Sequence, residues 1–131
     1  MTLVVAKIDH EGKMVYAGAH TDLLIYRAAT KSVDRIPTEG LWIGVTDDIA
    51  PVTDDRNITL DRGDIALFHT DGVTEARNRA GECFDIHRLS NQLRDLHAAP
   101  ATEIVTEIAN AAWLWAGTPK DDVSLLAVKR S

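Results

Sequence analysis

Acidic residues stand at two places where the sequence predicts the end of a strand. Asp71 follows the apolar run 65–68, with Gly72 directly behind it, and the pair Asp121 and Asp122 stands fifty residues further on, before the apolar run 123–128. A carboxylate held on rigid backbone at a strand end is an oxygen ligand of the kind that hard divalent cations prefer. The plain alternative is that Asp71 and Gly72 form an ordinary turn. The second acidic strand end is what favours a metal site.

The composition restricts the classes of function. The chain has 131 residues, of which 45% are hydrophobic and 26% charged, and this is typical of a globular protein with one sizeable core. Its formal net charge is −6 and its Lys and Arg residues are scattered, which argues against a nucleic-acid partner. The single cysteine, Cys83, excludes both an intramolecular disulfide and a thiolate zinc site.

The sequence also argues against a membrane partner. Its apolar runs all fall short of the roughly 18 residues that a membrane-spanning helix requires. The N-terminus lacks the charged and then apolar layout of a signal peptide. We therefore expect a cytoplasmic protein.

Hydrophobic periodicity predicts strands first, then helices, then one last strand. The short turns between the early strands indicate antiparallel pairing, so the predicted fold class is α+β with helices packed on a sheet face. A strand at 2–8 is expected to be mostly buried, one at 123–128 central, and Thr102 is expected to cap the second helix. The predicted strands are 2–8, 14–17, 22–28, 32–36, 57–60, 65–70 and 123–128, and the predicted helices contain Ile86, Leu89, Leu93 and Leu96 in one case and residues 100–116 in the other.

Seven short motifs, in this order and spacing, carry a resemblance to a known family. The chain resembles the PPM-type metal-dependent serine/threonine phosphatases, in the bacterial branch typified by SpoIIE and RsbU. The resemblance covers nearly the whole chain. The motifs are YAGAH at 16–20, LLIYR at 23–27, GLWIG at 40–44, LDRGD at 60–64, TDGVTEARN at 70–78, GECF at 81–84 and DDVSLL at 121–126.

The resemblance implies a two-metal phosphatase site. In that family antiparallel β-sheets are packed against helices, and carboxylates at strand ends hold two Mn²⁺ or Mg²⁺ ions. Such ions lower the pKa of a bridging water and neutralise charge on the phosphoryl oxygens, so that a side-chain nucleophile is not required. The resemblance implies that Asp71 and Asp121 are metal ligands. Asp122 is either the alternative ligand or a residue that supports one, because neighbours in a strand face opposite sides.

One departure from the family pattern bears on activity. The family has an upstream Asp-Gly block whose Asp bridges both metals, and this chain instead opens directly on a strand pattern. We therefore expect residues 1–131 to be a single phosphatase-like domain that lacks the N-terminal part. By itself it is expected to be weakly active or inactive, because one bridging ligand is missing.

Two functions remain open. The first is a phosphoserine/phosphothreonine protein phosphatase domain of bacterial stress or sporulation signalling, and the resemblance implies that its substrate class is a phosphorylated anti-sigma-factor antagonist. The second is a catalytically incompetent fragment that binds a partner or forms a homo-oligomer through the sheet exposed at residues 2–8. His20 and His69 are expected to be structural, because carboxylates satisfy a hard metal without imidazole. Glu75 is expected to cap or solvate the turn after Asp71 rather than to bind metal.

Overall fold

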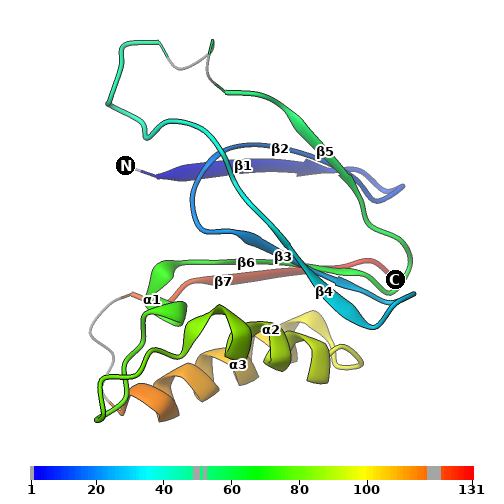
Figure 1. Ribbon diagram of the computed structural model, residues 1–131. Coiled ribbons are helices and arrows are strands. Elements are labelled where there is room, and N and C mark those ends of the chain that lie inside the picture. The colour runs from blue at the N-terminus through cyan, green and yellow to red at the C-terminus, as the bar shows by residue number, and fades with distance from the viewer. Residues whose placement is uncertain (1, 49–50, 52, 118–121) are drawn as a thin grey trace.

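The computed structural model describes residues 2–48, 51, 53–117 and 122–131. Figure 1 shows how the elements are arranged in space. Their bounds, in chain order, are β1 (Leu3–Ile8), β2 (Lys13–Ala19), β3 (Leu23–Arg27), β4 (Ser32–Ile36), β5 (Arg56–Thr59), β6 (Ile65–His69), α1 (Asp71–Thr74), α2 (Asp85–Asp95), α3 (Ala101–Ala116) and β7 (Leu125–Lys129).

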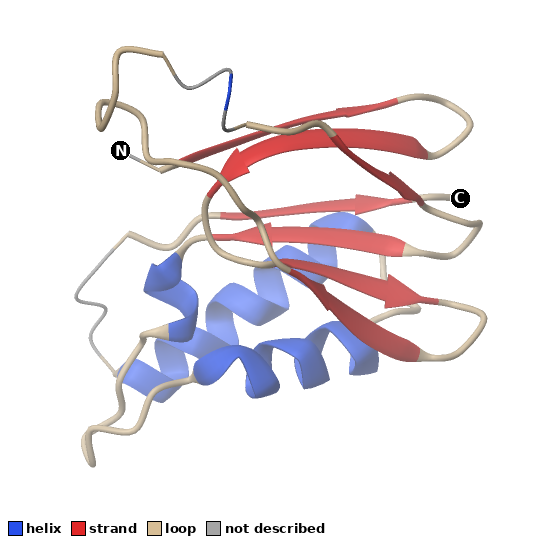
Figure 2. Ribbon diagram, turned by 45° about the horizontal axis from the view of Figure 1, so that its top comes forward, coloured by secondary structure: helices blue, strands red, loops and turns tan. Residues whose placement is uncertain are grey.

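The strands form two antiparallel sheets. One has the order β1-β2-β5 and the other β4-β3-β6-β7. Figure 2 shows the two sheets facing one another, with α2 and α3 covering the outer face of the four-stranded sheet. The predicted α+β class and the antiparallel pairing are confirmed.

Alternation along β3 explains why its first four residues, Leu23 to Tyr26, are all buried although they face two different sides. Leu24 and Tyr26 point to the helices, whereas Leu23 and Ile25 point to the three-stranded sheet, and all four are buried. The core beneath the helices is completed by Leu89 and Leu93 of α2 and by Ile104, Ile108 and Ala112 of α3. These helix residues recur at the spacing that predicted both helices.

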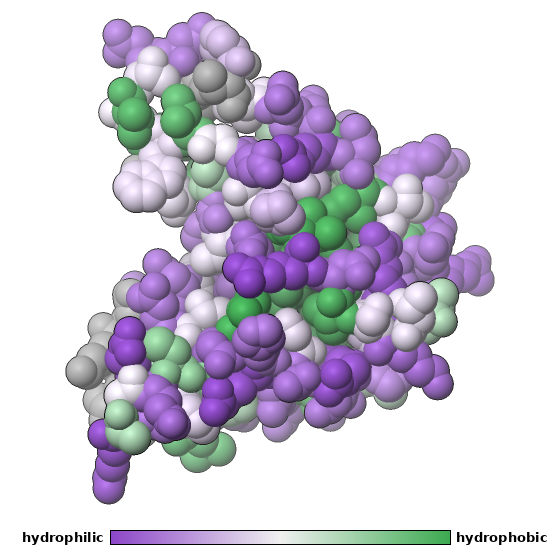
Figure 3. Space-filling model, in the orientation of Figure 1, coloured by the Kyte–Doolittle hydropathy of each residue, from purple (hydrophilic) through white to green (hydrophobic). Residues whose placement is uncertain are grey.

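The space between the two sheets holds a second core. It is built from Met14, Tyr16, Leu60 and Ala66 together with the inward side of β3. Figure 3 shows that polar residues dominate the viewed face, while hydrophobic residues reach the surface between the two sheets. The residues that form this inter-sheet core are themselves buried.

Three local predictions are wrong. The strand at 2–8 forms, but β1 is an edge strand on which Val5 keeps 62% of its surface exposed. The last strand, β7, is also an edge strand rather than a central one, and Leu126 is 59% exposed. The α3 helix begins at Ala101 after Pro100, whose carbonyl accepts hydrogen bonds from Glu103 and Ile104, so Thr102 lies inside the first turn. An apolar strand sequence shows that a strand forms but not how many neighbours it has.

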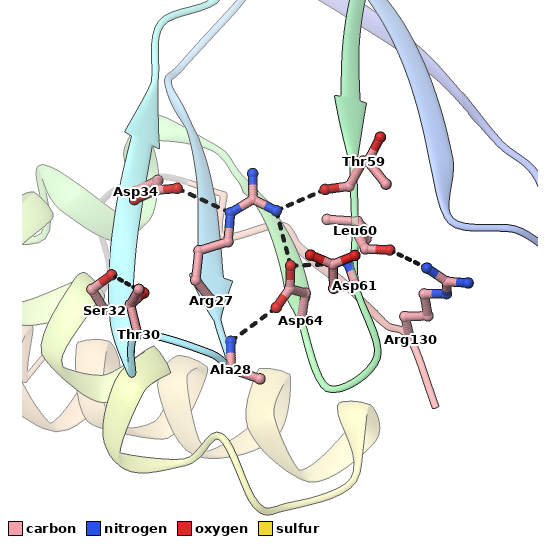
Figure 4. A network of polar contacts seen from close by, with 10 residues as sticks. All are labelled: Arg27, Ala28, Thr30, Ser32, Asp34, Thr59, Leu60, Asp61, Asp64 and Arg130. Atoms are coloured by element: carbon pink, nitrogen blue, oxygen red, sulfur yellow. Dashed lines mark hydrogen bonds and ion pairs between the residues drawn. The ribbon is translucent and has the colours of Figure 1, made fainter.

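A buried ionic network ties the two sheets together at the start of β6 (Figure 4). The Asp64 side chain is 2% exposed and accepts hydrogen bonds from Arg27 Nη1 at 2.8 Å, Ala28 N at 2.8 Å and Asp61 N at 3.0 Å. Arg27 also donates to Asp34 of β4 and to the carbonyl of Thr59 in β5. One carboxylate therefore fixes the turn that leads into β6.

None of the helices in the described residues is long and apolar enough to cross a bilayer.

Candidate metal site

Asp71 lies where β6 ends and the one-turn helix α1 begins. Thr70 is extended, with φ −93° and ψ 162°, and Asp71 is the first helical residue. Val73 is fully buried in the core beneath the helices, and the Glu75 N–H donates to the Asp71 carbonyl at 2.7 Å. Packing of Val73 therefore fixes the turn, while the Asp71 side chain stays exposed to solvent.

The approach to β7 runs beside this turn. Thr70 N donates to the Ser124 carbonyl at 3.1 Å, and Ser124 N donates to Thr70 Oγ1 at 3.0 Å. Thr70 Oγ1 in turn donates to the Asp122 carbonyl at 3.2 Å. The backbone of Asp122 therefore lies next to the residue that precedes Asp71. Asp121 lies outside the described residues, so its convergence with Asp71 stays a prediction.

A cavity of about 250 Å³ opens beside Asp71. The strand register explains its walls: Leu24 pairs with Leu67, so the start of β3 lies beside the end of β6, and Arg35 of β4 pairs with Leu24. The lining residues are Thr21, Asp22, Arg35, His69, Asp71, Thr74, Glu75 and Ile86.

Sequence reasoning missed Asp22 and Arg35 as members of this cavity. They form an ion pair between Arg35 Nε and Asp22 Oδ2. The signal that could have found Asp22 is its position at the start of the predicted strand 22–28, because antiparallel pairing with the strand 65–70 brings that start to the edge where Asp71 lies. Arg35 carries no comparable signal, since its place depends on the register of β4 against β3.

The charges in the cavity favour a cation. Three carboxylates, from Asp22, Asp71 and Glu75, and one guanidinium, from Arg35, give a formal charge of −3 + 1 = −2. His69 is 4% exposed, and burial lowers its pKa below the usual range, so the ring is neutral near pH 7. A neutral buried imidazole beneath Asp71 agrees with a structural role for His69.

The types of donor fit Mn²⁺ or Mg²⁺. Carboxylate and hydroxyl oxygens line the cavity, and hard divalent ions prefer oxygen ligands. Within the described ranges, however, groups of three or more His, Cys, Asp or Glu side chains arranged to hold a metal ion are absent. The described residues therefore provide suitable donors but fewer than a full set of ligands, and ligation by Asp71, Asp121 and Asp122 stays a prediction.

A known protein family and several solved structures match this chain over nearly its whole length. The family model described as Stage II sporulation protein E (SpoIIE) matches residues 1–131. The RsbU and RsbW domains of Rv1364c from Mycobacterium tuberculosis are 26% identical to this chain with a TM-score of 0.79, and the match covers 98% of this chain and 36% of that one. No curated protein sequence gave a significant match.

Two structures of SpoIIE from Bacillus subtilis share the fold. The PP2C phosphatase domain with a fragment of the regulatory domain is 20% identical with a TM-score of 0.80, covering 98% of this chain and 37% of that one. The Mn-presoaked phosphatase domain is 16% identical with a TM-score of 0.74, covering 99% of this chain and 56% of that one. This chain therefore spans about half the length of that solved phosphatase domain.

Proposed function

Because the chain belongs to the Stage II sporulation protein E (SpoIIE) family, we propose that it is part of a phosphoserine/phosphothreonine protein phosphatase domain. The observation that carries the proposal is the junction of β6 and β7, where Thr70 hydrogen-bonds to Asp122 and Ser124 beside an acidic cavity. Asp71 would hold one side of a two-metal hydrolysis site there.

The geometry of this junction supports a role for each site residue. Asp71, with Asp121 or Asp122, would bind Mn²⁺ or Mg²⁺; one of the adjacent pair would face the cations, because neighbouring residues in an extended chain face opposite sides. When bound, the ions would activate a water and neutralise phosphoryl charge. The chain's own contribution would be to hold Asp71 at the end of β6, beside the backbone of Asp122.

The family relationship supports the finer assignments. We infer a signalling role of the stress or sporulation type, a phosphorylated protein such as an anti-sigma-factor antagonist as substrate, and a cytoplasmic setting without nucleic-acid or membrane partners. The 26% identity to the RsbU and RsbW domains of Rv1364c supports a phosphatase domain of the RsbU type.

The 131-residue chain is expected to release phosphate from a phosphoserine peptide far more slowly than the roughly 10 s⁻¹ of a typical enzyme. The reason is that its described residues do not supply a full set of metal ligands. Any Mn²⁺-dependent release should disappear in Asp71→Asn and persist in Asp54→Asn, which changes an exposed acid in the loop before β5. A colorimetric assay of phosphate release measures the rate of the wild-type chain and of the two variants.

Two outcomes would contradict this. A rate typical of an enzyme would mean that another residue completes the site. Residual Mn²⁺-dependent release that is equal in wild type and Asp71→Asn would remove Asp71 from the site.

A second candidate function, self-association, rests on a separate observation. Both edge strands β1 and β7 line one apolar groove of about 440 Å³, formed by Val4, Ala6, Ile8, Phe68, Leu126 and Val128. An unprotected edge beside an exposed apolar groove recruits another strand. We infer that the recruited strand is the β1 of a second copy.

The sequence of β1 suits antiparallel pairing with itself. A twofold axis at Val5 would place Leu3 opposite Lys7 and Val4 opposite Ala6, so the single charged residue of the strand would not meet its own copy. Each copy would then present the same surface to the other, as a twofold dimer requires.

Val5→Lys is expected to convert such a dimer to a monomer at low micromolar concentration, because it places like charges opposite each other in the paired strands. Thr59→Lys is the matched control, since it adds the same charge on β5, the other edge of the same sheet. Sedimentation velocity shows whether each variant is a monomer or a dimer. A wild-type chain that is monomeric and binds no hydrophobic dye would end the self-association hypothesis.

A further inference from the structure

Arg35 has a position that the two-metal site alone does not explain. Among the described residues that line the cavity beside Asp71, Arg35 is the only Lys or Arg. Its side chain is 60% exposed, so the guanidinium can be reached from solvent. A cationic group on the wall of an otherwise acidic cavity is suited to an anionic group that enters from outside.

The ion pair of Arg35 leaves most of its donors free. Nε engages Asp22 Oδ2, and within the described part of the chain the two Nη groups have no further hydrogen bond. A guanidinium carries five N–H donors in a planar fork, and this fork matches the oxygens of a phosphoryl group. Asp22 thus holds one edge of the fork in place while the other edge remains open.

The strand arrangement places this fork on the same cavity as Asp71. Arg35 lies on β4 opposite Leu24 of β3, and Asp22 lies two residues before Leu24. Thr21, two residues before the first residue of β3, donates its hydroxyl hydrogen to the carbonyl of His69, two residues before Asp71. Backbone pairing across β4, β3 and β6 therefore positions Arg35 relative to the predicted metal ligand.

We propose that Arg35 binds the phosphoryl group of a phosphoserine substrate through its Nη groups. This rests on the proposed phosphatase function and assigns the residue that recognises the phosphate. The carboxylates of the cavity repel the doubly charged phosphoryl group. Binding therefore depends on divalent cations at Asp71 as well as on Arg35. The cavity of about 250 Å³ accommodates a group the size of a phosphorylated serine side chain.

The test compares a fluorescent phosphoserine peptide with its unphosphorylated counterpart, by anisotropy, on the 131-residue chain with excess Mn²⁺. Wild type should prefer the phosphorylated peptide, and Arg35→Ala should weaken its binding by about tenfold or more, because a charge-assisted bidentate contact is lost. Arg35→Lys should restore part of the affinity, since Lys supplies the charge without the fork. Arg62→Ala, which removes an exposed arginine near the opposite end of β6, should leave the affinity unchanged.

The outcomes separate the inference from the function on which it rests. Wild-type preference for the phosphorylated peptide that persists in Arg35→Ala, or an equal loss in Arg62→Ala, overturns the role of Arg35 alone. A wild-type chain without any preference for the phosphorylated peptide overturns the proposed phosphatase function as well. Circular dichroism tests whether Arg35→Ala is folded. If Arg35→Ala is unfolded, the peptide affinity of Arg35→Lys is compared with that of wild type instead.

Discussion

Asp64→Ala is expected to lower the free energy of unfolding by about 3 kcal/mol or more. The substitution removes a carboxylate whose side chain is 2% exposed and leaves the N–H groups of Ala28 and Asp61 without their acceptor. It also removes the more buried of the two carboxylates that pair with Arg27. Because a whole domain is stabilised by only about 5–15 kcal/mol, this single change should be visible as a large shift in urea denaturation.

Asp34→Ala is the matched control for this prediction. Asp34 pairs with the same arginine, but its side chain is 45% exposed, and exposed ion pairs contribute at most about 1 kcal/mol. If Asp64→Ala and Asp34→Ala lowered the free energy of unfolding equally, burial of Asp64 would not be the reason for its contribution to stability.

The Asp64 carboxylate also makes the stability of the folded chain depend on pH. Burial alone raises the pKa of Asp64, but hydrogen bonds from Ala28, Arg27 and Asp61 outweigh it, and the pKa is lowered below the ordinary 3.8. The unfolded chain therefore takes up the proton first as the pH falls. The stabilisation by Asp64 is present above pH 3.8 and is lost as the pH falls through the lower, folded pKa. The difference between wild type and Asp64→Ala should shrink over that range.

Asp71→Asn is expected to weaken Mn²⁺ binding by at least about tenfold, since even residues that only support a metal ligand change affinity by about 10–100-fold. Without metal, the variant should be as stable as wild type, because the Asp71 side chain is exposed. Thermal denaturation with increasing Mn²⁺ measures both effects, since a bound ion raises the melting temperature.

Asp54→Asn serves as the control because it removes an equal charge from an exposed loop. If both variants lost the same part of the Mn²⁺-induced rise in melting temperature, the ion would be responding to net charge rather than to a ligand at position 71.

Periodicity was sufficient to predict most of the secondary structure. Leu89 and Leu93, and likewise Ile104 and Ile108, recur at helical spacing and are buried together in one core. The strand predicted at 32–36 coincides with β4, Ser32–Ile36. The two helices have a local pattern that burial on one face imposes on the sequence, whereas in β4 Val33 and Ile36 pack against different cores.

The neighbours of each strand could not be predicted in the same way. The sequences of β1 and β7 are as apolar as those of central strands, yet both strands lie at sheet edges. Apolar residues indicate that the faces of a strand are buried by other side chains. They do not indicate whether its edges are hydrogen-bonded. The number of hydrogen-bonded neighbours is a property of the assembled sheets.

The candidate site was predictable only in part. Asp71 stands out because an acid follows a buried apolar run and precedes a glycine. Its position at the start of α1 also depends on Val73, which anchors the turn in the core. Arg35 enters the cavity only through the register of three strands, and this register is set by pairs such as Leu24 with Leu67 that carry no chemical signal of their own.

The most direct test of the metal site is to locate bound Mn²⁺ by paramagnetic broadening of the amide NMR signals. We expect substoichiometric Mn²⁺ to broaden the signals of Thr70, Asp71, Gly72 and Ser124 first. Gly12 and Gly63, which lie at the opposite end of the sheets, should stay sharp, and Mg²⁺ should shift the same signals as Mn²⁺ without broadening them. Broadening centred on other residues, or spread evenly over the chain, would contradict a metal site at the junction of β6 and β7.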